Sequence, residues 1–116
     1  MASAQKKSQE RRTERRVKVS RRATLLDGTT PLPCLIEDFS TGGFFIISNQ
    51  DLFYVGQILE LKCELYPEKV LLCKIEIRHI AETCLGTKIL EISKDATVLL
   101  NQFLQEYYSL KLNQST

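Results

Sequence analysis

The sequence predicts a small all-β domain, either a sandwich or a barrel, that is followed by a C-terminal helix. Two patterns predict this class. About six short segments in which apolar and polar residues alternate are separated by Gly, Pro, Asn and Asp turns. The C-terminal segment instead repeats its apolar residues at helical spacing. A length of 116 residues fits one domain with one modest core.

The expected strands follow one another from residue 17 to residue 92. Alternation is cleanest in 58–65, Ile-Leu-Glu-Leu-Lys-Cys-Glu-Leu, which predicts one buried and one solvated face. Asp27-Gly28 follows an apolar stretch and is a strong hairpin signal. The other expected strands are 17–26, 34–38, 44–47, 70–80 and 84–92.

Residues 94–112 are expected to form the helix. Ser93 or Asp95 suits its N-terminus, and the Asp95 carboxylate suits the positive end of the helix dipole. One face is apolar and carries Leu99, Leu100, Phe103, Leu104 and Tyr107. We expect this face to pack across one mouth or side of the β-domain. A dimer interface is the less favoured use, so a monomer or a weak dimer is expected.

Charge is unevenly divided along the chain. Residues 1–22 hold nine Lys and Arg against two Glu, which gives +7. The remaining residues hold seven basic and twelve acidic groups, which gives −5 and an overall charge of +2. We expect residues 1–16 to form a flexible basic arm on a mildly acidic domain spanning 17–93. Such an arm favours an anionic ligand.

Several classes of function are not expected. The chain has no apolar run of about 18 residues and no apolar signal sequence at its start, so we expect a cytoplasmic protein without membrane insertion. Its single cysteines lack C-x-x-C spacing and fit small apolar strand residues rather than a metal site. The lone His79 has no nucleophile motif or carboxylate pair around it and fits an ordinary surface or core histidine. We therefore expect no enzyme activity, no catalytic residues and no cofactor.

Two clusters of residues carry the strongest functional signal. The first is the R-x-x-x-R pattern in Glu10-Arg11-Arg12-Thr13-Glu14-Arg15-Arg16. The second is D-x-S-x-x-G in Asp38-Phe39-Ser40-Thr41-Gly42-Gly43. Each cluster alone is weak evidence, because arginine runs are often solvated faces and Asp, Ser and Gly are common in turns. Their combination with a β-rich domain is more informative.

The chemistry of both clusters fits an anionic ligand that carries guanine. An arginine fork grips a phosphate or the O6 and N7 of guanine with two parallel hydrogen bonds. The Asp38 carboxylate suits the N1–H and N2–H₂ donors of guanine, which adenine does not present together. The Ser40 hydroxyl is available to a phosphate or a base edge. Gly42 and Gly43 are expected to permit positive φ and a close approach of the backbone to the ligand.

This combination resembles the PilZ domain family of bacterial receptors for cyclic di-GMP, over roughly residues 10–107. The resemblance implies a six-stranded antiparallel β-barrel with a C-terminal helix. It selects Arg12 and Arg16 as the arginine pair, because Val17 supplies the aliphatic residue that follows in the family; Arg11 and Arg15 fit less well. It assigns ligand binding to Arg11, Arg12, Arg16, Asp38, Ser40, Gly42 and Gly43. The basic Arg11 is similar to a family feature that accompanies binding of an intercalated ligand dimer, and both one and two ligand molecules stay open.

The signalling hypothesis is that the ligand clamps the arm over the barrel and creates a surface that an unknown downstream protein reads. Two alternatives stay open. A basic-armed barrel could bind RNA or DNA, although the acidic body and the apparent burial of Phe44, Phe45 and Phe103 argue against a specific nucleic-acid partner. A ligand-independent scaffold for protein contacts is the other. Arg78 is a further candidate for contact with ligand or partner.

Overall fold

The computed structural model describes residues 16–48 and 52–115, and the side chains of residues up to 108. The chain forms β1 (Arg16–Val17), β2 (Arg21–Asp27), β3 (Thr30–Ser40), β4 (Gly43–Ile47), β5 (Ile58–Tyr66), β6 (Lys69–Ala81), β7 (Cys84–Ile92) and α2 (Lys94–Ser115). The helix begins where the sequence predicts and ends three residues beyond the predicted 112.

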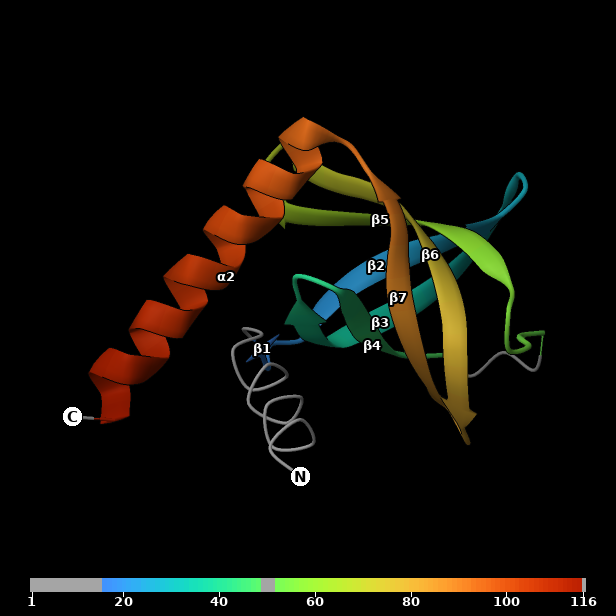
Figure 1. Ribbon diagram of the computed structural model, residues 1–116, viewed down its shortest axis with the longest axis horizontal. Coiled ribbons are helices and arrows are strands. Elements are labelled where there is room, and N and C mark those ends of the chain that lie inside the picture. The colour runs from blue at the N-terminus through green and yellow to red at the C-terminus, as the bar shows by residue number, and fades with distance from the viewer. Residues whose placement is uncertain (1–15, 49–51, 116) are drawn as a thin grey trace, which may run out of the picture.

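Six of the strands close into an antiparallel barrel. The order of pairing is β3-β2-β5-β6-β7-β4, and a further pairing of β4 with β3 closes the ring. The predicted six-stranded barrel is confirmed, and β1 is an additional short strand that pairs with β3. Figure 1 shows the barrel strands wrapped around one another, with α2 beside one end of the barrel near β1.

The barrel core follows directly from the alternation in the sequence. Along β5, Leu59, Leu61, Cys63 and Leu65 are buried, whereas the residues between them are exposed. The first hairpin uses the predicted glycine: Asp27 pairs with Thr30, and Gly28 has φ +67°. A glycine with positive φ at the first position of a two-residue turn matches the right-handed twist of the strands.

The helix closes one end of the barrel through aromatic packing. Ser93 caps it, because the Ser93 Oγ accepts a hydrogen bond of 3.1 Å from the Ala96 amide. Phe103 is fully buried, with its ring centroid 4.9 Å from that of Phe39 in β3. The Arg21 guanidinium lies 5.5 Å from the Phe103 ring centroid and donates to the Tyr107 hydroxyl. Arg21, which belongs to the basic stretch of residues 1–22, therefore joins β2 to the helix.

The four cysteines are unpaired and lie in β3, β5, β6 and β7, as predicted for apolar strand residues. Burial raises the pKa of Cys34 and Cys73 to about 12 and that of Cys63 to about 11. These three thiols therefore stay protonated at neutral pH. Within residues 16–48 and 52–115, no group of three or more His, Cys, Asp or Glu is placed to hold a metal ion. None of the described helices is long and apolar enough to span a membrane.

Candidate functional site

The pairing of β1 with β3 brings the two sequence motifs together. Arg16 pairs directly with Ser40, and Val17 pairs with Phe39. Paired residues in an antiparallel ladder have Cα atoms about 4.5–5.5 Å apart. Arg16, assigned to the arm from sequence, is thus the first residue of a strand, because Val17 is buried and holds β1 on the barrel. Arg11 and Arg12 lie outside the described residues.

Ser40 organises the turn between β3 and β4. Its hydroxyl donates to the Gly43 carbonyl at 2.9 Å and accepts from the amides of Gly43 at 3.0 Å and Gly42 at 3.3 Å. Ser40 is only 8% exposed. The proton of this hydroxyl is therefore used in a hydrogen bond within the turn. One reason for a serine in the motif is that it stabilises this turn.

We expect Ser40→Ala to destabilise the domain by about 2 kcal/mol, because the buried carbonyl and amides of the turn lose their partner. Urea unfolding measures this change. The matched control is Ser20→Ala, since the Ser20 hydroxyl makes an exposed bond to Glu37 and its loss should cost at most about 0.5 kcal/mol. Equal stability of the two variants would refute the structural role of Ser40.

The two glycines of the motif do not have the predicted positive φ. Among the glycines of this chain, positive φ occurs at Gly28 and Gly56. Gly43 is required for a different reason: a Cβ there would lie 2.0 Å from the Thr87 carbonyl oxygen in β7. The close approach is therefore between two strands of the barrel. Gly42 contributes its carbonyl, which accepts a hydrogen bond of 2.8 Å from the Ile89 amide.

A β-bulge in β3 turns Asp38 outward. Ile36 pairs with Ile46 and Asp38 pairs with Phe45, so Glu37 is an extra residue in the ladder. Ile36 is fully buried, and regular alternation would point Asp38 into the core as well. The bulge reverses that alternation and places the half-buried Asp38 on the outer face of the barrel.

A second bulge, in β6, turns His79 outward in the same way that the first bulge turns Asp38 outward. Ile77 pairs with Thr87 and His79 pairs with Gly86, so Arg78 is the extra residue. Ile77 is buried, whereas Arg78 and His79 are both exposed. The Arg78 guanidinium forms an ion pair of 3.1 Å with Glu76.

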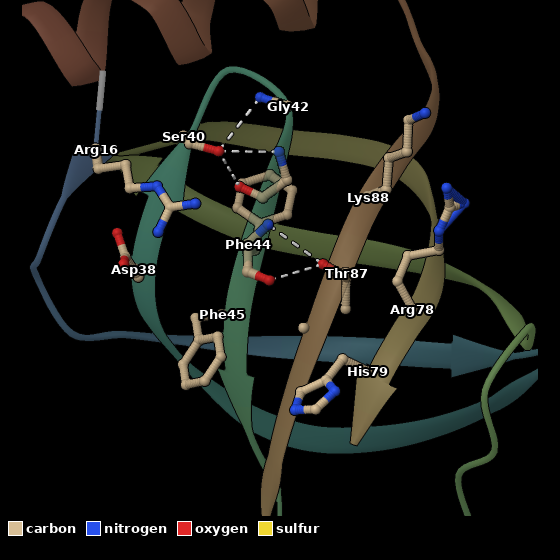
Figure 2. A pocket seen from close by; sticks show the side chains of 12 residues that line it. Arg16, Asp38, Ser40, Gly42, Phe44, Phe45, Arg78, His79, Thr87 and Lys88 are labelled. Atoms are coloured by element: carbon tan, nitrogen blue, oxygen red, sulfur yellow. Dashed lines mark hydrogen bonds between the residues drawn. The ribbon is translucent and has the colours of Figure 1, made fainter. Parts of the chain in front are cut away.

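Between these two bulges lies an open cavity of about 460 Å³. Figure 2 shows Arg16 and Asp38 on one side of it; on the other side are Lys88, which is carried by β7, and Arg78 beyond that strand. The lining residues are Arg16, Asp38, Ser40, Gly42, Gly43, Phe44, Phe45, Arg78, His79, Gly86, Thr87 and Lys88. All the predicted site residues that the structure describes therefore line one cavity.

The cavity is also lined by residues that were not predicted as part of the site. Phe45 was grouped with core or loop aromatics, yet it is 41% exposed at the cavity. Alternation was an available signal, because Phe44 and Ile46 on either side of Phe45 are buried. His79 and Lys88 carried no signal in the sequence, since their placement depends on the bulge in β6 and on the pairing of β7.

The charges around the cavity suit an anion. Arg16, Arg78 and Lys88 supply three cationic groups, and Asp38 supplies an acceptor. Arginine forks and a lysine bind phosphate oxygens, while a carboxylate pairs with N–H donors. The cavity can therefore hold a molecule with both phosphates and hydrogen-bond donors.

Comparison with known proteins identifies the family. The PilZ domain model matches residues 9–106. No significant match is found among curated proteins. The fold is similar to the PilZ domain of YcgR from Escherichia coli, solved with c-di-GMP, at a TM-score of 0.72 and 12% identity over 90% of this chain and 97% of that one.

Two longer proteins share the fold. MotI/DgrA, an inhibitor of motility from Bacillus subtilis, gives a TM-score of 0.69 at 21% identity, covering 89% of this chain and 52% of that one. PlzA from Borreliella burgdorferi, solved in complex with c-di-GMP, gives 0.64 at 19% identity, covering 89% of this chain and 45% of that one. The present chain thus spans about half the length of these two proteins. The match of the family model over most of its residues shows that this chain belongs to the PilZ domain family.

Proposed function

We propose that this chain is a receptor for cyclic di-GMP and not an enzyme. The observation that carries this proposal is the pairing of Arg16 with Ser40, which joins the arginine motif and the D-x-S-x-x-G motif at one cavity. Membership of the PilZ family supports it, as does the similarity in fold to the PilZ domain of YcgR and to PlzA, both solved with c-di-GMP.

The role proposed for each residue follows from the chemistry of its side chain. Arg16 and Arg12, with Arg11 beside them, bind phosphate oxygens and the O6 and N7 atoms of guanine. Asp38 accepts from N1–H and N2–H₂ of one guanine. Ser40 shapes the turn, and the backbone of Gly42 and Gly43 that it holds in place borders the ligand.

We propose that the signal is relayed by residues 11–15 and a partner protein. Arg16 in β1 lines the cavity, and Arg11, Arg12 and Arg15 precede it closely in the sequence. Fixing the backbone of each residue costs about 1–2 kcal/mol of conformational free energy. Each charge-assisted hydrogen bond contributes about 1.5–3 kcal/mol in the other direction. A short segment with several arginines can therefore be held by the ligand. The surface so formed is what a downstream protein would recognise.

A thermal shift experiment tests the function. Cyclic di-GMP at about 100 times its Kd should stabilise the domain by about 2.7 kcal/mol and raise its Tm by on the order of 10 °C. Single-stranded RNA at the same phosphate concentration should shift Tm far less at physiological salt. A larger shift with RNA, lost steeply as salt rises, would instead favour the nucleic-acid-binding alternative.

A further inference from the structure

Four residues form a continuous row across four strands of the outer barrel surface. Asp38 in β3 pairs with Phe45 in β4, Phe45 pairs with Gly86 in β7, and Gly86 pairs with His79 in β6. All four line the cavity. Both ends of the row face outward because of the two bulges, at Glu37 and at Arg78. Bulges are frequent beside binding sites, where they redirect a side chain.

The row contains a gap between two aromatic rings. Phe45 is 41% exposed and His79 is also exposed, whereas Gly86 between them has no side chain. Figure 2 shows the Phe45 and His79 rings on either side of β7. The β7 residue that pairs with both of them is Gly86. Since adjacent strands are about 4.8 Å apart, the backbones that carry the rings are separated by about 10 Å.

Two rings that stand on backbones this far apart can take one planar base between them. Stacked aromatic rings have centroids about 4.5–7 Å apart, so a base held between two rings needs them about 9–14 Å apart. Bases stack readily on Phe and His side chains. The cations Arg16 and Lys88 line the same cavity, where they can neutralise the phosphates of the nucleotide that carries the base.

We propose that Phe45, Gly86 and His79 form a slot for the second purine base of the ligand. This proposal rests on the proposed function and extends it. Asp38 accepts hydrogen bonds from the edge of one guanine, and the second guanine stacks between Phe45 and His79 in the slot. One cyclic dinucleotide thus spans the row from Asp38 to His79, and affinity depends on residues outside both sequence motifs.

A purely structural role for Phe45 makes different predictions. An aromatic ring opposite a glycine in a sheet shields the bare backbone and stabilises the pairing. In that case Phe45→Ala would lower stability and leave ligand affinity unchanged in the folded protein. His79→Ala and Gly86→Val would not affect affinity either.

The single histidine of the chain provides a direct readout on the unmodified protein. The His79 ring protons give a unique pair of NMR signals. Saturation with cyclic di-GMP should move them upfield, because a stacked purine shields protons above its face. The same titration of Phe45→Ala should give a smaller upfield movement. Unmoved His79 signals at saturation would overturn the slot.

Affinity measurements on variants complete the test. Loss of one stacking partner should weaken binding about 5- to 150-fold in Phe45→Ala and His79→Ala. Gly86→Val should weaken it comparably by filling the slot; a Cβ at this position would meet His79 Cβ at 3.4 Å, an ordinary contact, and circular dichroism checks that the variant is folded. The control Leu90→Ala removes a side chain of similar exposure, 43%, away from the cavity and should bind normally.

The outcomes separate this inference from the function on which it rests. If the unaltered protein binds cyclic di-GMP while all three variants bind as tightly as Leu90→Ala, the slot is refuted and the receptor function stands. If the unaltered protein does not bind the ligand, both fail.

Discussion

Arg16→Ala is expected to reduce the affinity for cyclic di-GMP by at least about 100-fold while the protein stays folded. Arg16 is exposed, lines the cavity and pairs with Ser40 through its backbone, which alanine retains. Two charge-assisted hydrogen bonds at about 1.5–3 kcal/mol each account for a loss of this size. Titration calorimetry measures the affinity, and circular dichroism checks the fold.

Two further variants show whether position and geometry matter as well as charge. Lys18→Ala removes an exposed cation two residues away that does not line the cavity, and it should bind almost normally. Arg16→Lys keeps the charge but loses the planar fork, so it should bind much more weakly than the unaltered protein. Arg12→Ala should resemble Arg16→Ala. Normal binding by the double variant of Arg12 and Arg16 would refute this assignment.

Gly43→Ala is expected to destabilise the barrel by about 3 kcal/mol or more. The new Cβ would lie 2.0 Å from the Thr87 carbonyl oxygen, where real contacts are not below 3.0 Å, so β4 and β7 must separate by about 1 Å. That movement strains the hydrogen bonds of the Thr87 Oγ1, which donates to the Phe44 carbonyl at 2.9 Å and accepts from its amide. Overpacking of this kind costs about 1–3 kcal/mol and at times more. Urea unfolding measures the loss.

Gly86→Ala is the matched control for this prediction. It lies in the same strand pair, but its Cβ would be 3.4 Å from His79 Cβ and 3.8 Å from the His79 carbonyl oxygen. The change in stability should therefore stay below about 1 kcal/mol. If Gly43→Ala is as stable as Gly86→Ala, the glycine of the motif is not required for strand packing.

Local patterns predict the elements of this fold well. The alternation in 58–65 and the apolar face with Leu100, Phe103 and Leu104 both appear in the structure as buried surfaces. These features depend on neighbours within a few residues, so the sequence alone reveals them. The closure of the barrel depends on the pairing of β3 with β4, which the chemistry of the individual segments does not specify.

The site is less predictable than the strands, because the residues that line it are brought together by the register in which distant strands pair. The motif residues Arg16, Asp38 and Ser40 were predicted as a group, and the structure places them at one cavity. The positive φ expected at Gly43 was wrong. The strand packing that requires a glycine there could not be predicted locally, since the residue that approaches it lies 44 positions further on, at Thr87. His79 faces the cavity because of the bulge at Arg78. No pattern in the neighbouring residues predicts that bulge.

The central claim is that the cavity recognises a guanine-bearing cyclic dinucleotide. The most direct test is a calorimetric titration of the unaltered protein with cyclic di-GMP and, separately, with cyclic di-AMP, which has the same phosphates but no N1–H and N2–H₂ donors. Saturable binding of cyclic di-GMP, at least about 100-fold tighter than that of cyclic di-AMP, is the predicted result, because Asp38 would otherwise lack donors. Equal affinity for both, or no binding of cyclic di-GMP, would contradict the claim.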